Sequence, residues 1–157
     1  MFFNFNIKNL FNLEKVNFIF FNPGKRKSSN LLDKTTISIL FIDDEKFPIV
    51  DNLHHAGWNT KRITDVKNLQ DPQIIQAQII FVDYEGVGNF LFPKEKGIGI
   101  VRALKETYFN TKRVILYSGH NIFPVDAEFE VADARLSKNS DLYEFIRIIE
   151  SEIKKIK

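Results

Sequence analysis

Short apolar runs alternate with longer amphipathic stretches between residues 37 and 153. The runs at 37–42, 78–82 and 113–117 are apolar at nearly every position, which is typical of strands buried on both faces of a parallel sheet. Two shorter runs, at 60–63 and 134–137, are more polar, and the first of them is predicted to lie near a sheet edge. The pattern therefore predicts five strands.

Helical signals fill the stretches between these strands. Pro48 suits the first turn of a helix, because that turn makes no use of the N–H that proline lacks, and Gly57 can end this helix. Ser140 can cap the last helix, in which apolar residues recur at helical spacing. Another helix is predicted to begin at Asp71-Pro72 and to include Ala77. Two more are predicted at residues 97–108 and 124–131. Strands that alternate with helices predict an α/β domain with a doubly wound, five-stranded parallel sheet.

Residues 1–34 differ from the rest and form a predicted separate segment ahead of a domain at 35–157. The segment is rich in Phe and Asn, but Lys8, Glu14 and Lys15 interrupt it, so it is not a clean membrane span, and it lacks the features of a secretory signal. A basic linker at 23–30 follows. Residues 1–27 can therefore contact an anionic membrane surface or a partner, or else form an extra helix on the domain or a poorly ordered tail.

Composition excludes several classes of function. The chain has 157 residues, which suits one domain with a substantial core, and its net charge of +2 comes from mixed signs, so no nucleic-acid-binding surface is expected. The chain has no cysteine, which excludes disulfides, thiolate zinc sites and thiol nucleophiles. This composition is compatible with a cytoplasmic protein, with membrane association through residues 1–27 as an extension.

Polar side chains stand at the ends of the predicted strands. Asp43 and Asp44 end the first strand, Asp83 the third, Ser118 the fourth, and Lys138 follows the fifth. The carboxyl ends of parallel strands meet at one edge of the sheet, so these groups are expected to line one pocket. Adjacent buried carboxylates repel each other, and a divalent cation bound between them would neutralise this repulsion. The alternative for Asp43 and Asp44 is that they cap the next helix.

This set of residues resembles the receiver domain of two-component response regulators, over about residues 36–155. The resemblance implies the flavodoxin-like receiver fold, with Mg²⁺ held by the adjacent acids and the central aspartate. It also implies that Asp83 accepts a phosphoryl group from a histidine kinase, and that Ser118 and Lys138 contact the phosphoryl oxygens. The candidate metal residues are Asp43, Asp44, Asp83 and Glu85, and the candidate catalytic residues are Asp83, Ser118 and Lys138.

The chain departs from that family at several positions. The loop after Asp83 lacks the usual Met-Pro pair and is longer, and Asn139 replaces the proline after the lysine, so a cis peptide bond is not expected there. Arg135 occupies the position of the aromatic switch residue and is too long and charged to bury readily. Glu85 and His120 flank the path of the attacking water in the family; the alternative is that both are exposed loop residues.

Two functions from different classes follow from this resemblance. The first is a phosphoacceptor receiver that takes its phosphoryl group from a histidine kinase or phosphotransfer protein and signals to a downstream protein by surface contact. Its enzymatic activity is at most Mg²⁺-dependent self-phosphorylation and dephosphorylation. The alternative is a pseudo-receiver, an interaction module with no phosphorylation cycle, which the altered loops and Arg135 favour. No nucleic-acid partner is expected.

Overall fold

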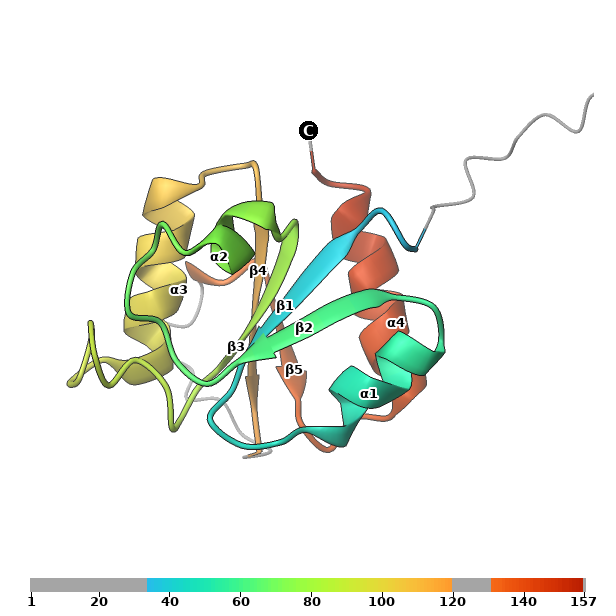
Figure 1. Cartoon of the computed structure of the whole chain (residues 1–157), viewed down its shortest axis with the longest axis horizontal. Coiled ribbons are helices and arrows are strands. Elements are labelled where there is room, and N and C mark those ends of the chain that lie inside the picture. Colours follow the sequence, from blue (N-terminus) through green and yellow to red (C-terminus); the bar gives the residue numbers. More distant parts are fainter. Residues whose placement is uncertain (1–33, 120–130, 157) are drawn as a thin grey trace, which may run out of the picture. The chain divides into compact units, whose positions relative to one another are not determined.

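The protein forms a five-stranded, fully parallel sheet with helices on both faces (Figure 1). A computed structural model describes residues 34–119 and 131–156, and the structural statements below concern these residues. The strand order is β2-β1-β3-β4-β5, the order of flavodoxin-like folds. The strands are β1 (Ser38–Ile42), β2 (Asn59–Ile63), β3 (Ile79–Asp83), β4 (Arg113–Ser118) and β5 (Ala134–Ser137).

The predicted fold class is therefore confirmed, and so is the predicted edge position of the strand at 60–63. The polar strand β2 lies at an edge of the sheet, and the wholly buried strand β3 lies at its centre. Helices α1 (Pro48–His55) and α4 (Leu142–Ile153) cover one face of the sheet, while α2 (Pro72–Gln76) and α3 (Lys96–Thr107) cover the other (Figure 1). Both faces are buried, which explains why the central strands are apolar at nearly every position.

Alternation along the strands divides the core into two halves. The side chains of Leu40, Ile80 and Leu116 belong to the aliphatic cluster that includes residues of α2 and α3. The intervening residues face α1 and α4, where five rings contact one another in a cluster of aromatic side chains: Phe41, Phe47, Phe81, Tyr117 and Phe145. Because side chains alternate, the carboxylates of Asp43 and Asp83 continue the rows of Phe41 and Phe81 on this second face.

Two predicted helix boundaries need correction. The N-cap of α4 is Asp141, whose side chain accepts a hydrogen bond from the backbone N–H of Glu144, so the prediction of Ser140 was wrong. Helix α2 ends at Gln76, and Ala77 is its C-cap rather than an internal residue. Helix α1 ends as expected: Gly57, at φ +90°, accepts a backbone conformation that other residues avoid.

Three predictions fall outside the described residues and stay predictions. They are the helix at 124–131 apart from Val131, the role of His120, and the separate segment at residues 1–34, apart from Lys34, with its membrane or partner contact. None of the helices in the described ranges has both the length and the apolar content of a membrane span. The described peptide bonds include no cis bond, so the expectation for Lys138–Asn139 is confirmed.

Candidate functional site

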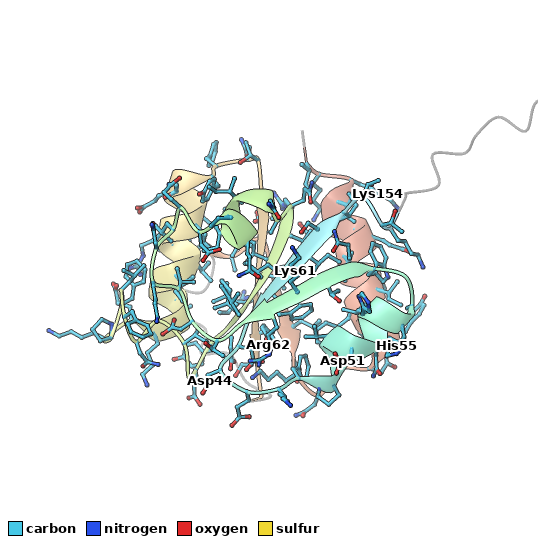
Figure 2. All side chains as sticks on the ribbon, in the orientation of Figure 1. Asp44, Asp51, His55, Lys61, Arg62 and Lys154 are labelled. Carbon is cyan, nitrogen blue, oxygen red and sulfur yellow. The ribbon has the colours of Figure 1, made fainter. Side chains whose placement is uncertain are left out.

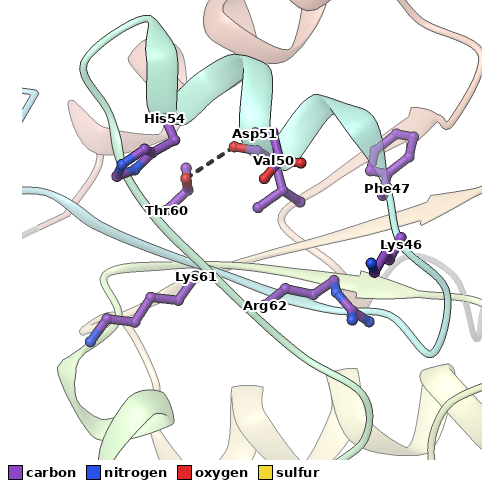
Figure 3. A pocket seen from close by; sticks show the side chains of 8 residues that line it. All are labelled: Lys46, Phe47, Val50, Asp51, His54, Thr60, Lys61 and Arg62. Atoms are coloured by element: carbon purple, nitrogen blue, oxygen red, sulfur yellow. Dashed lines mark hydrogen bonds between the residues drawn. The ribbon is translucent and has the colours of Figure 1, made fainter.

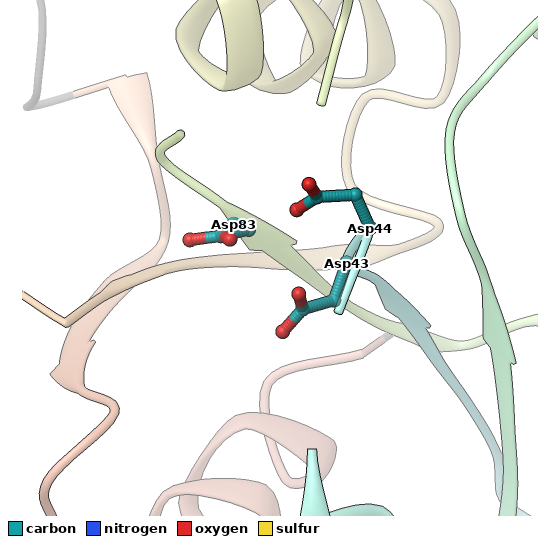
Figure 4. Close-up of side chains that lie close together, drawn as sticks. All are labelled: Asp43, Asp44 and Asp83. Atoms are coloured by element: carbon teal, nitrogen blue, oxygen red, sulfur yellow. The ribbon is translucent and has the colours of Figure 1, made fainter. Parts of the chain in front are cut away.

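Three carboxylates converge where β1 and β3 end (Figure 4). Asp43, Asp44 and Asp83 each offer one oxygen, and these oxygens all lie within 4.8 Å of one another. Asp43 is fully buried, Asp83 is 5% exposed, and Asp44 is exposed to solvent. The structure thus brings together the three aspartates that the strand ends predicted, and Asp43 and Asp44 do not cap α1, whose N-cap is Phe47.

Lys138 provides the positive charge of this site. Its Nζ lies 2.6 Å from Oδ2 of Asp83 and 3.0 Å from Oδ2 of Asp43, so one ammonium bridges the two buried carboxylates. The backbone N–H of Lys138 donates to the carbonyl oxygen of Ser118 at 2.7 Å, which ties the segment after β5 to the end of β4. The predicted lysine therefore lies beside the predicted phosphoryl acceptor.

A cavity of about 360 Å³ opens above these groups. Ser118, at the end of β4, is buried with 2% of its surface exposed and lies on the cavity wall. Glu85 lies on the wall as well, but its carboxylate is not part of the three-carboxylate group. The lining residues are Asp44, Glu45, Asp83, Glu85, Gly86, Ser118, Gly119 and Lys138. A role of Glu85 as a metal ligand stays a prediction.

Burial controls the electrostatics of the central aspartate. Desolvation raises the pKa of Asp83 to about 6, and the nearby Asp43 carboxylate adds to the rise, although the hydrogen bond and charge of Lys138 oppose it. Burial alone would lower the pKa of the Lys138 ammonium, but the hydrogen bonds and charges of Asp83 and Asp43 outweigh it and hold this pKa above its ordinary value. Lys138 therefore remains charged and only partly compensates the paired acids.

The long loop after β3 is held against the site. Gly86 has φ +81°, a backbone conformation that favours glycine, and a Cβ atom at this position would also meet the carboxylate of Asp44 unless that side chain moved. The carboxylate of Asp65, in the loop after β2, accepts hydrogen bonds from the backbone N–H groups of Gly88 and Asn89 at 2.6 and 2.9 Å. Asp65 thus fastens this loop beside the three carboxylates.

Two residues of the site were not found from the sequence. The hydroxyl of Tyr117 donates to Oδ2 of Asp43 at 2.6 Å; the only signal in the sequence was a hydroxyl in an otherwise apolar strand. Nη1 of Arg62 donates to the backbone oxygens of Asp43 at 2.6 Å and Glu45 at 3.1 Å. Figure 2 shows Arg62 at the same edge of the sheet as Asp44.

Arg62 also lines a second cavity, of about 480 Å³, between α1 and β2 (Figure 3). The hydroxyl of Thr60 in this cavity donates to the carbonyl oxygen of Val50, which joins the edge strand to the helix. Arg62 therefore connects β2 to the loop that carries the acidic residues. A signal for this role was not visible in the sequence, because an arginine on an edge strand is ordinary.

The residues at the three-carboxylate group fit a hard divalent cation. Mg²⁺ prefers carboxylate oxygens together with water, and the exposure of Asp44 leaves room for water. Asp43 and Asp83 are partly neutralised by Lys138, but three carboxylates face one ammonium, so the group carries an excess of negative charge. The donor set and the charge both favour a cation such as Mg²⁺.

The raised pKa of Asp83 predicts how the stability of the folded protein depends on pH when a chelator keeps it free of metal. The folded protein keeps the Asp83 proton up to about pH 6, whereas the unfolded chain releases it near pH 3.8. Folding is therefore weakened as the pH rises from about 4 to about 6, by up to about 3 kcal/mol from this group. The side chain of Asn does not titrate, so Asp83→Asn does not lose stability in this way as the pH rises. Its stability relative to wild type, measured by urea unfolding, should therefore rise over the same pH range. An unchanged difference between pH 4.5 and 7.5 would contradict the prediction.

Comparison with known proteins supports the fold. No family model matches the chain, and no curated protein matches it. Solved structures do match. The receiver domain of the TMAO respiratory system response regulator TorR is 22% identical with a TM-score of 0.60, over 77% of this chain and 99% of that one. A response regulator from Thermotoga maritima is 17% identical with a TM-score of 0.56, over 76% and 99%.

A third solved structure also matches the fold. A response regulator protein from Burkholderia pseudomallei, described as having a phosphorylated aspartic acid and a calcium ion, is 15% identical with a TM-score of 0.53, over 74% of this chain and 72% of that one. At these identities the likeness concerns the fold. The chain has the fold of the receiver domains of response regulators.

Proposed function

We propose that this protein is a phosphoacceptor receiver of two-component signal transduction, phosphorylated on Asp83. The observation that carries the proposal is the position of the Asp83 carboxylate. It ends the central strand, borders the cavity, and lies 2.6 Å from the Lys138 ammonium and beside two further aspartates. Nucleophile, fixed cation and metal-binding oxygens are thus adjacent, as phosphoryl transfer requires.

The proposed step is a displacement at phosphorus. Oδ1 of Asp83, the oxygen that does not accept the hydrogen bond from Lys138, attacks the phosphorus atom. The bond from phosphorus to the donor breaks, and the donor leaves with the electron pair. The product is an acyl phosphate on Asp83. Lys138 neutralises charge on the phosphoryl oxygens, and the Ser118 hydroxyl donates a hydrogen bond to one of them. Bound Mg²⁺, which Asp43, Asp44 and Asp83 would hold, would supply further charge neutralisation.

Partners follow from the same chemistry. A phosphohistidine of a histidine kinase or phosphotransfer protein is the proposed donor, and a downstream protein is the proposed recipient of the signal. Hydrolysis of the acyl phosphate, in which water attacks phosphorus and the bond to the Asp83 oxygen breaks, would end the signal. The fold shared with response-regulator receiver domains supports this role, and a reducing cytoplasm, where histidine kinases act on receivers, is the proposed location.

The test is direct phosphorylation of the full chain. With acetyl phosphate and Mg²⁺, intact mass should show one added phosphoryl group that is lost at alkaline pH, as acyl phosphates are labile. Asp83→Asn should gain none, while Asp51→Asn, a change to an exposed aspartate on α1, should gain one. Labelling of Asp83→Asn would place the acceptor elsewhere.

The pseudo-receiver is the second candidate, and the exposure of Arg135 on β5 favours it. In the receiver family an aromatic residue at this position moves inward on phosphorylation, and an exposed arginine cannot do so readily. Absence of labelling of wild type with acetyl phosphate and with several histidine kinases would overturn the phosphoacceptor proposal in favour of this alternative.

A further inference from the structure

The buried hydroxyl of Tyr117 points at the acidic site. Residues of β4 alternate between the two faces of the sheet, and Tyr117, which pairs in register with Asp83, faces α1 and α4. Its side chain is fully buried, and its hydroxyl donates to Oδ2 of Asp43 at 2.6 Å. Burial raises the pKa of the phenol, and the charge of Asp43 raises it further, so the hydroxyl keeps its proton and can act only as a donor to this carboxylate.

The Asp43 carboxylate has a donor on each oxygen. Oδ1 accepts the backbone N–H of Glu45 at 3.0 Å, while Oδ2 accepts both the Tyr117 hydroxyl and the ammonium of Lys138, the latter at 3.0 Å. Asp43 is fully buried, so water cannot replace a donor that is removed. The Tyr117 hydroxyl and the Lys138 ammonium therefore both stabilise the negative charge on Oδ2 of Asp43.

Neighbouring rings hold the phenol in place. The ring of Tyr117 makes edge contacts with Phe41 and Phe81, both at 6.0 Å between centroids, and a tilted contact with Phe47 at 5.6 Å. The Lys138 ammonium lies 5.2 Å from the centre of the same ring. Because the ring is packed on several sides in a close-packed core, the hydroxyl cannot swing away from Asp43 without repacking the cluster.

We propose that Tyr117 is a positioning residue for the metal and phosphoryl site. Its hydroxyl fixes the orientation and the charge of Asp43, and so allows Lys138 to leave Asp43 when a divalent cation or a phosphoryl group occupies the cavity. The inference rests on the proposed function for its phosphoryl part; its metal part is independent of phosphorylation. Without the hydroxyl, the Asp43 carboxylate retains the ammonium, whose charge repels an incoming Mg²⁺.

Tyr117→Phe tests the inference because it keeps the ring and removes only the hydroxyl. Mg²⁺ affinity of the full chain, measured by NMR titration in the absence of any phosphodonor, should fall by about tenfold, as when a residue that orients a metal ligand is lost. Tyr143→Phe removes the hydroxyl of a tyrosine that is 70% exposed on α4, and should leave the affinity unchanged. Thermal unfolding in chelator checks that each variant is folded.

A double-mutant cycle with Asp43→Asn separates positioning from general destabilisation. If Tyr117 acts through Asp43, then adding Tyr117→Phe to Asp43→Asn should change the Mg²⁺ affinity by less than about twofold. An equal loss in both backgrounds, or wild-type affinity in Tyr117→Phe, would overturn the inference. Wild-type protein that binds Mg²⁺ and responds to Tyr117→Phe, yet gains no phosphoryl group, would overturn the proposed function alone and support the role of Tyr117.

Discussion

Replacing Lys138 by methionine is expected to destabilise the metal-free protein by about 3 to 5 kcal/mol at pH 8. The substitution keeps most of the apolar stem but removes the only ammonium within ion-pair distance of Asp43 and Asp83 among the described residues. Two buried carboxylates then face each other with no cation between them. Removing one partner of a buried ion pair costs this much because the remaining charges stay desolvated.

The loss should depend on pH and on metal. Lys138 lowers the pKa of Asp83, so without it this pKa rises above about 6 and Asp83 stays protonated to higher pH. The destabilisation should therefore be much smaller at pH 4.5, and millimolar Mg²⁺ should reverse part of it at pH 8 by supplying the missing charge. Urea unfolding provides the measurement. Lys61→Met, at an exposed position on edge strand β2, is the matched control and should change stability little. A pH-independent loss would argue against the proposed charge balance.

A change at Arg113 should have an effect of similar size at the opposite end of the sheet. Arg113 begins β4, and its guanidinium contacts Asp133 at 2.9 Å and Glu152 of α4 at 2.7 Å. The Glu152 side chain is 3% exposed, so Arg113→Met leaves a carboxylate desolvated with only the ammonium of Lys155, itself half exposed, as its partner. We expect a loss of about 3 to 5 kcal/mol in the free energy of unfolding.

Arg147→Met is the matched control for this network. Arg147 pairs with Glu144 on the surface of α4, where the arginine side chain is 67% exposed, and such pairs contribute at most about 1 kcal/mol. The double variant Arg113→Met/Glu152→Met removes both charges and should recover much of the loss, because apolar side chains can occupy the same space. Equal effects of Arg113→Met and Arg147→Met would show that burial does not govern this network.

The sequence alone was sufficient for the fold class and for most of the site. Apolar runs buried on both faces determined that the sheet is parallel, and a polar residue at the end of each run determined which side chains meet. Asp43, Asp44, Asp83, Ser118 and Lys138 all lie where this rule predicted. The rule works because strand ends are placed by backbone topology, which the period of the hydrophobic pattern encodes directly.

Local choices between neighbours were less predictable. Ser140 and Asp141 are both good N-cap residues, and it is Asp141 whose side chain accepts the backbone N–H of Glu144. Such boundaries commonly shift by one or two residues, since the local energies of the alternatives differ little.

Only the tertiary structure decided how the charges of the site are balanced. That Lys138 bridges Asp43 and Asp83, and that Tyr117 donates to Asp43, are contacts between residues 55 to 95 positions apart. Two other contacts likewise join separate segments. Asp65 holds the long loop after β3, and Arg62 holds the loop that begins at Asp43. These contacts depend on side-chain rotamers, on burial and on which residues share a face at a given strand register. A hydrophobic pattern limits these properties but does not determine them, because they arise from the packing of all the elements together.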